Sequence, residues 1–284
     1  MSRRRPFQQV DVFTSRPLLG NPVAVVLDGT GLSTEQMLAF TAWTNLSEAT
    51  FVSPPTDPRA DYAVRIFCPG RELPFAGHPT LGTCLAWLAS GGRPAGDRII
   101  QECGAGLVPI RHDGVHLAFA APPRRRTGPL AEADVMAIAA CLGIDRAAIV
   151  DHEWCDNGPL WQTVLLEDAD SVLALQPRPE LLGGRDIGVV GPHRSESEVD
   201  YEVRAFFPGN QGLTEDPVTG SLNAAIAQWL IGSGRASTRF RTAQGTALGR
   251  AGRVDISSDG EEIWVGGQCV TVVTGDVVVD DIEA

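Results

Sequence analysis

The sequence predicts an α+β fold made of two pseudo-symmetric domains, in each of which β-strands wrap around a buried central helix. One observation is a run without charged residues from Pro217 to Gly234, which follows a helix-start signal at Asp216-Pro217. A helix that is apolar on every side must be buried, so strands are expected to surround it. A second uncharged run follows His78-Pro79, and the segments around both runs recur in the same order.

The internal duplication is clearest just before these two helices. Residues 64–70 and 203–209 both read Val-Arg-x-Phe-x-Pro-Gly, with β-branched and aromatic residues typical of a strand that ends in a turn. Each copy then continues through a helical run that closes on Trp-Leu and two glycines. Such a repeated order predicts two domains of the same architecture.

Other elements extend the match more faintly. In Leu19–Val26, a turn rich in Asn, Gly and Pro precedes a β-rich run. The segment Cys155–Trp161 has the same pattern. Gln101–Phe119 resembles Thr242–Ile256, a glycine-punctuated hairpin with alternating apolar residues. Each half is therefore expected to contain strands, a short amphipathic helix, more strands, the buried helix and a hairpin.

The domain boundary is expected at the basic, proline-containing stretch 122–126. The strand-like segment 270–279 has no counterpart at the end of the first half, which suggests that it crosses back to the first domain. We therefore expect an N-terminal domain of residues 1–122 plus about 270–284, and a C-terminal domain of residues 128–269.

Composition limits the partners and the compartment. The net charge of −12 and a pI near 4.8 argue against nucleic acid, which requires a positive surface. The uncharged runs barely reach spanning length and carry Gly, Ser, Thr and Pro, so no membrane span is expected. Arg3-Arg4-Arg5 lacks a following apolar segment, which favours a cytoplasmic protein over a secreted one. The six cysteines are scattered without metal-ligand spacing and are expected to be reduced, packed thiols.

We expect the functional site to lie where the two central helices begin. If the domains are related by a pseudo-two-fold axis, both helix starts can face one cleft, where unpaired N–H groups attract a carboxylate. The residues at its edge are Gly77 and His78 from one domain, and Asp216, Thr219, Gly220 and Ser221 from the other. Asp216 and His78 hold the same place in the two copies, although each also fits a purely structural role as helix cap or turn residue.

A third candidate is Glu48, which lies between an apolar helix end and a β-rich segment. Partial burial there would raise the carboxyl pKa toward the range in which it can take and return a proton. Spacing alone favours a surface glutamate, and composition does not single this residue out.

At these residues the sequence resembles the PhzF family of phenazine-biosynthesis-like isomerases and epimerases, whose fold is that of diaminopimelate epimerase. The matching motifs run in family order along nearly the whole chain: Gly20–Val25, Asn45–Glu48, Arg65–Phe67 with Pro69, Glu72–Gly82, Glu215–Ser221, and Gln244-Gly245 with Gly249-Arg250. The two long motifs, around His78 and around Asp216, are specific.

The resemblance implies an active site in the cleft, usually a homodimer, and a reaction without cofactor or metal. In such a reaction a glutamate moves a proton within an unsaturated, carboxylate-bearing amino acid. That glutamate matches Glu48, assisted by His78 and Asp216, while Ser47, Gly77, Thr219, Gly220 and Ser221 match substrate-binding positions.

Two other functions remain open. Related racemases and epimerases use one cysteine at each helix start, and here neither the AGHPTLG nor the EDPVTGS motif contains one. A two-thiol racemase is therefore disfavoured. A non-catalytic binder of small molecules that has kept the cleft is the remaining alternative, because fold alone does not fix function.

Overall fold

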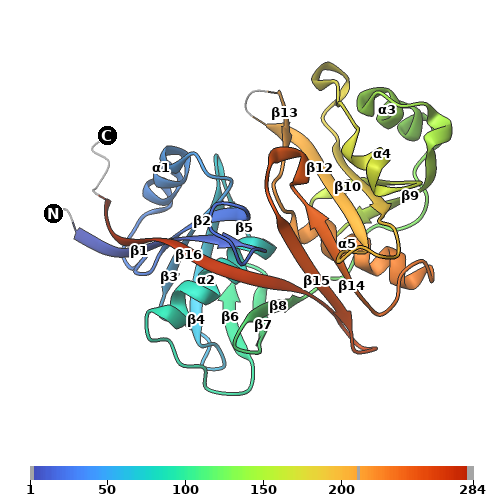
Figure 1. The fold of residues 1–284 in the computed structure, drawn as a ribbon. Coiled ribbons are helices and arrows are strands. Elements are labelled where there is room, and N and C mark those ends of the chain that lie inside the picture. The colour runs from blue at the N-terminus through green and yellow to red at the C-terminus, as the bar shows by residue number, and fades with distance from the viewer. Residues whose placement is uncertain (1–2, 210–211, 280–284) are drawn as a thin grey trace. The chain divides into compact units, whose positions relative to one another are not determined.

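The computed structural model describes residues 3–209 and 212–279, which divide into two compact units (Figure 1). The first unit contains the described residues up to Ala120 and those from Gly266 onward; the second is Ala121–Val265. Within the described part of the chain, no helix is both long and apolar enough to cross a membrane.

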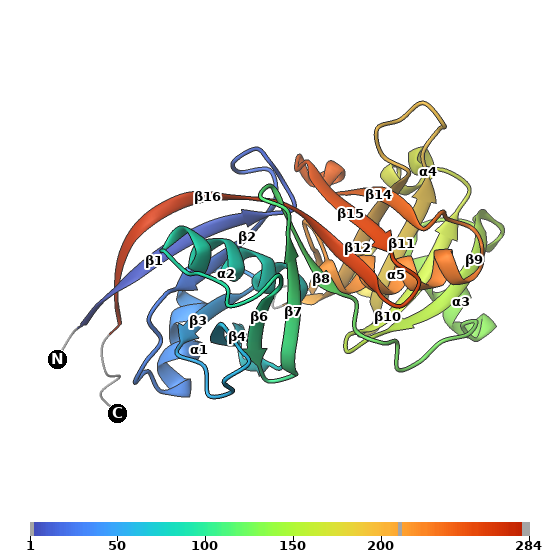
Figure 2. The same ribbon diagram turned by 90° about the horizontal axis from the view of Figure 1, so that it is seen from below.

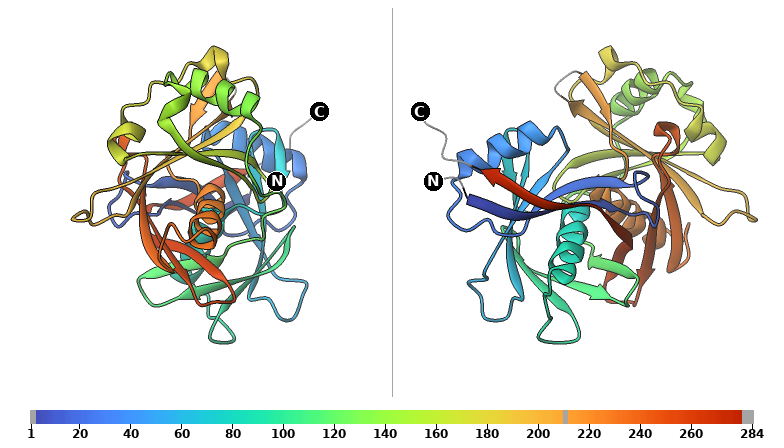
Figure 3. Two further views of the ribbon diagram at one scale, coloured as in Figure 1. Left: turned by 90° about the vertical axis from the view of Figure 1, so that its right-hand side faces the viewer. Right: turned by 60° about the vertical axis from the view of Figure 1, so that its left-hand side comes forward.

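The first unit is a sheet that closes around one helix. Its elements are β1 (Arg3–Val12), β2 (Asn21–Val26), α1 (Thr34–Thr44), β3 (Ala49–Ser53), β4 (Tyr62–Cys68), β5 (Arg71–Leu73), α2 (Gly77–Ala89), β6 (Ile99–Cys103), β7 (Gly106–His112), β8 (His116–Ala120) and most of β16 (Ile263–Val279). The strands follow the order β1-β2-β3-β4-β6-β7-β8-β16, and β16 also pairs with β1. Helix α2 therefore lies inside a ring of strands, as the right-hand view of Figure 3 shows.

The second unit repeats this plan. It contains α3 (Glu132–Leu142), η1 (Arg146–Ala148), β9 (Ile149–Asp156), β10 (Leu160–Leu166), α4 (Ala169–Leu173), η2 (Pro179–Leu181), β11 (Asp186–Pro192), β12 (Tyr201–Gly209), β13 (Gly212–Glu215), α5 (Gly220–Gly232), β14 (Arg239–Gln244), η3 (Thr246–Leu248) and β15 (Gly252–Ser258). The strands follow the order β9-β10-β11-β12-β14-β15-β16.

Strand pairing has the same sequence of directions in both units. β1–β2, β3–β4 and β6–β7 are antiparallel, while β2–β3 and β4–β6 are parallel. β9–β10, β11–β12 and β14–β15 are likewise antiparallel, while β10–β11 and β12–β14 are parallel. The expected fold class, two α+β units with strands around a central helix, is confirmed.

The repeated Val-Arg-x-Phe motif forms the same hairpin twice. Arg65 on β4 pairs with Glu72 on β5 at 2.6 Å, and its guanidinium lies over the ring of Phe67. Arg204 on β12 pairs with Glu215 on β13 at 2.7 Å and lies over Phe206 in the same way. The motif therefore specifies a cross-strand ion pair as well as strand propensity.

Both central helices are buried and carry one matching polar contact. The fourth residue of α2, Thr80, accepts a hydrogen bond from Gln101 on β6. The fourth residue of α5, Asn223, accepts one from Thr242 on β14. All four side chains are fully buried, so these bonds satisfy polar groups inside otherwise apolar cores.

Strand β16 carries the chain from the second unit into the first. Its pairing with β1 is antiparallel and runs from Arg3–Val279 to Val12–Cys269, with one bulge between Gln9 and Val10. Figure 2 shows the two strands curving side by side. The segment 270–279 thus pairs with β1 of the first unit.

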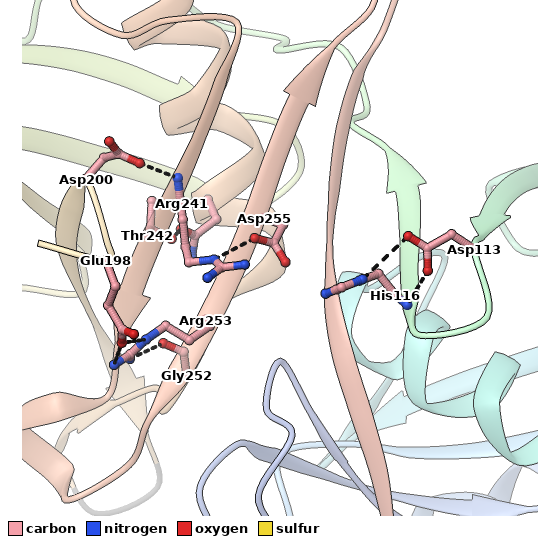
Figure 4. A network of polar contacts seen from close by, with 10 residues as sticks. Asp113, His116, Glu198, Asp200, Arg241, Thr242, Gly252, Arg253 and Asp255 are labelled. Carbon is pink, nitrogen blue, oxygen red and sulfur yellow. Dashed lines mark hydrogen bonds and ion pairs between the residues drawn. The ribbon is translucent and has the colours of Figure 1, made fainter.

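A polar network in the second unit fixes the connection between β11 and β12. Glu198 pairs with Arg253 of β15 at 3.0 Å, and the Asp200 carboxylate accepts a hydrogen bond of 2.7 Å from the Arg241 backbone N–H on β14 (Figure 4). Arg241 in turn pairs with Asp255 at 2.6 Å. These contacts join the β11–β12 connection to β14 and β15.

Candidate active site

Glu48 is positioned by the end of α1 and the start of β3. Helix α1 stops at Asn45, which adopts the left-handed conformation that commonly ends a helix. The Glu48 carbonyl then accepts a 3.4 Å hydrogen bond from the Ala24 N–H of β2, which fixes the backbone. Its side chain is 17% exposed, so the expected partial burial is observed.

His78 is the second residue of α2 and lies beside Glu48. Its Nε2 is 3.3 Å from Glu48 Oε2, and its Nδ1 is 3.4 Å from the Asn21 amide nitrogen. Burial lowers the His78 pKa to about 3, opposed in part by a hydrogen bond to the Pro22 carbonyl. The ring is therefore neutral at pH 7, and its contact with Glu48 joins a neutral imidazole to a carboxyl group.

The first backbone N–H groups of α2 have no side-chain cap and could donate hydrogen bonds to a ligand. Ala76 occupies the N-cap position and supplies no side-chain hydrogen bond, and Gly77 is the first helical residue. Backbone N–H groups at such a start carry partial positive charge. The first unit therefore brings together Glu48, His78 and Gly77, whereas Ser47 is exposed beside them in the chain.

The second unit builds its helix start from a different set of side chains. Asp216 Oδ2 accepts a 2.6 Å hydrogen bond from the Thr219 hydroxyl, and Gln244 bonds the Thr219 N–H, the Thr219 hydroxyl and the Asp216 carbonyl. Gln244 is fully buried. This network fixes the turn between β13 and α5 and holds the Asp216 side chain beside the helix start.

Ser221 is the second residue of α5 and is held from β10 and the turn before it. Trp161 Nε1 donates to the Ser221 hydroxyl at 3.1 Å, and the Asn157 amide donates to the Ser221 carbonyl at 2.8 Å. An accepting hydroxyl still has its own hydrogen to donate. The second unit thus gathers Asp216, Thr219, Gly220 and Ser221.

Two expectations about these helix starts are wrong. Helix α5 begins at Gly220 with Thr219 as N-cap, and not at Asp216 or Pro217. The residue in α5 that corresponds to His78 is consequently Ser221, since each is second in a helix of 13 residues. Asp216 instead follows β13 directly, and its carboxylate accepts the hydrogen bond that the Thr219 hydroxyl donates.

Sequence reasoning missed the residues that hold these side chains: Asn21, Asn157, Trp161 and Gln244. A signal was present for the two asparagines, because each belongs to the Asn-containing turn that recurs in both halves. Gln244 lies in a family motif and Trp161 in the recurring turn segment, but both act across the fold, and no local pattern indicates which residues they contact.

The cysteines do not provide a thiolate at either helix start. Cys84 is the eighth residue of α2, fully buried, and burial raises the pKa of its thiol well above the ordinary value. All six cysteines are free, as expected for reduced thiols.

Comparison with known proteins places this arrangement in a family. The sequence model of the phenazine biosynthesis-like proteins, PhzC-PhzF, matches residues 10–275. The chain belongs to this family. It is 37% identical to antisense-enhancing sequence 1 of Schizosaccharomyces pombe, over 95% of this chain and 97% of that protein.

PhzF relatives include named enzymes. The chain is 34% identical to trans-2,3-dihydro-3-hydroxyanthranilate isomerase of Pseudomonas aeruginosa, over 88% of this chain and 89% of that enzyme. The PhzF-family protein of Bacillus anthracis superposes with a TM-score of 0.83, over 98% of this chain and all of that chain, at 22% identity. We identify the chain as an isomerase of the PhzF family.

Proposed function

We propose that this PhzF-family isomerase moves a proton within a small, unsaturated, carboxylate-bearing amino acid, without a cofactor, and that Glu48 carries the proton. The observation that supports this most directly is the 3.3 Å contact between the Glu48 carboxyl and the buried, neutral His78. A carboxylate in such surroundings can act as base and, once protonated, as acid.

The proposed reaction has two proton transfers. The Glu48 carboxylate takes a proton from a substrate carbon, and the electron pair spreads over the adjacent π-system. The protonated Glu48, whose acid hydrogen can exchange with water, then returns a proton to another carbon of that system, so the double bonds shift and nothing is gained or lost. Because the His78 ring is neutral, it assists as a hydrogen-bond partner of Glu48 and not as a fixed positive charge.

The helix starts supply the proposed binding groups. We assign substrate binding to Ser47 and Gly77 in the first unit, and to Thr219, Gly220 and Ser221 in the second, with Asp216 as an assisting polar group. Support comes from the absence of side-chain caps on both helices and from the hydroxyl of Ser221, oriented by Trp161.

The homodimer implied by family resemblance is part of the same proposal, and sedimentation equilibrium tests it.

The test is isotope exchange in D2O with trans-2,3-dihydro-3-hydroxyanthranilate, the compound named for the Pseudomonas relative, and with plain amino acids in parallel. Deuterium at a ring carbon is the expected result. Deuterium at Cα with loss of chirality would instead establish an epimerase, and an absence of label with all compounds, despite binding, would leave a binding protein.

Replacement of the proposed base provides the decisive variant. Glu48→Gln should lower exchange about a hundred- to ten-thousand-fold, the usual contribution of general acid–base catalysis, while circular dichroism stays unchanged. Glu72→Gln is the matched control, because Glu72 is a surface partner of Arg65 in the same unit and its loss should leave exchange in place. Undiminished exchange in Glu48→Gln would refute the role of Glu48.

A further inference from the structure

Two buried asparagines hold equivalent places in the two units. Asn21 is the first residue of β2 and Asn157 precedes β10, and they are 1% and 8% exposed. Each amide nitrogen approaches the second residue of the central helix, His78 in one unit and Ser221 in the other. The duplication has therefore kept an orienting amide at both helix starts, although the residues they orient differ.

The contact between Asn21 and His78 bears on the tautomer of the ring. The Asn21 amide nitrogen lies 3.4 Å from His78 Nδ1 and can donate to it only when Nδ1 carries no hydrogen. Hydrogen on Nδ1 would instead suit an acceptor, and the Pro22 carbonyl lies near the ring as such a group. The neutral ring therefore has two competing tautomers, and Asn21 favours the one with hydrogen on Nε2.

The tautomer of His78 determines whether an N–H donor or a nitrogen lone pair faces the Glu48 carboxylate. With hydrogen on Nε2, the ring presents a donor 3.3 Å from Glu48 Oε2, and slight closure makes a charge-assisted hydrogen bond. With hydrogen on Nδ1, a nitrogen lone pair faces the carboxylate at that distance, and the ionised base is disfavoured. The Asn21 amide and the ionised Glu48 therefore support the same state of the ring.

We propose that Asn21 is a positioning residue: its amide donates to Nδ1 of His78 and so keeps the ring hydrogen on Nε2, facing Glu48. The catalytic importance of this arrangement rests on the proposed function, but the tautomer itself does not. Asn21 acts only through His78 and is assigned no contact with substrate.

The tautomer can be measured directly. Long-range ¹H–¹⁵N correlation spectra of the full chain labelled at its five histidines report which ring nitrogen is protonated, and His78→Gln assigns the signals of His78. We expect the Nε2–H tautomer at pH 7. Asn21→Asp keeps the size of the side chain but replaces the donor with an acceptor, so the hydrogen should move to Nδ1 or the ring should become doubly protonated.

Two further variants separate this role from a structural one. Asn157→Asp is the matched control, and it should leave the His78 signals unchanged because that amide orients Ser221. If Asn21→Asp does not fold, Asn21→Ala takes its place and should give signals of mixed tautomers. An Nδ1–H tautomer in the unmodified chain, or an Nε2–H tautomer that survives every change at Asn21, would overturn the proposal.

Exchange activity gives the second readout. Asn21→Asp should lower D2O exchange about tenfold or more, mainly through kcat, because Glu48 loses its donor while the binding groups remain. If the unmodified chain shows the Nε2–H tautomer but no exchange with any compound, the proposed function fails and the orienting role of Asn21 stands. If exchange is present but the tautomer is independent of Asn21, only the inference about Asn21 fails.

Discussion

At the residue scale, the same ion pair occurs in both units but in different surroundings. The Arg204 and Glu215 side chains are 6% and 10% exposed, and Arg204 also donates to the Leu175 carbonyl at 2.8 Å. The corresponding Arg65 and Glu72 side chains are 37% and 41% exposed. Duplication therefore provides one buried and one solvated version of a single contact.

The buried version should be far less tolerant of losing its acid. Glu215→Ala leaves a buried guanidinium uncompensated and should lower the free energy of unfolding by about 3 kcal/mol or more. Glu72→Ala removes a solvated pair and should cost less than about 1 kcal/mol. Urea titration of both variants measures the difference, and equal losses would contradict the importance of burial here.

At the element scale, the sequence predicted the existence of the central helices better than their starts. An uncharged run requires burial whatever surrounds it, so α2 and α5 follow from local pattern. The start of α5 does not, because Asp216 followed by proline is a strong local cap signal that tertiary contacts override. Pairing of β13 with β12 extends to Glu215, and Gln244 on a distant strand bonds the Thr219 N–H.

The same division applies to the candidate site. Glu48, His78 and Asp216 are candidates because they lie in motifs that resemble those of the family, and the structure gives each an environment that sequence could not supply. The neutrality of His78 depends on burial by the surrounding strands, and the orientation of Ser221 on an indole 60 positions earlier in the chain. Long-range partners of this kind have no periodic signature.

Close packing of α2 on its strands makes a second element-scale prediction. A Cβ on Gly82 would lie 2.3 Å from Val23 Cγ1 and 3.0 Å from Val12 Cγ2. Gly82→Ala should therefore destabilise the protein by about 1–3 kcal/mol, although alanine is the better helix former. A Cβ at Gly232 in α5 would meet nothing within 4 Å, so Gly232→Ala should be neutral or stabilising in the same denaturation experiment.

Relief of the clash distinguishes packing from other causes. Val23→Ala removes the methyl group that the new Cβ would meet, so the double variant Gly82→Ala with Val23→Ala should lose less stability than the sum of the two single variants. Additive losses would show that the cost arises elsewhere in the helix.

At the scale of the whole molecule, the order of elements in the chain differs from the grouping of elements into units. The first unit is closed by β16, which the chain reaches only after the second unit is complete. Val277 and Val279 of this strand pack against the cluster around Phe40 and Phe51. The first unit therefore cannot complete its sheet until the last strand is available.

Removal of that strand should act unequally on the two units. A chain truncated after Cys269 lacks nearly all of the β1–β16 pairing. From Arg3 to Asp11, β1 then has no β16 residue opposite it, although its pairing with β2 remains. The second unit has two apolar clusters of its own, built on α3 and on α5, which the truncation leaves intact. Hydrogen exchange followed by mass spectrometry should show loss of protection in residues 3–120 and retained protection in residues 121–265. Equal loss in both units would mean that they fold as one cooperative body, and unchanged protection in the first would mean that β16 is dispensable for its sheet.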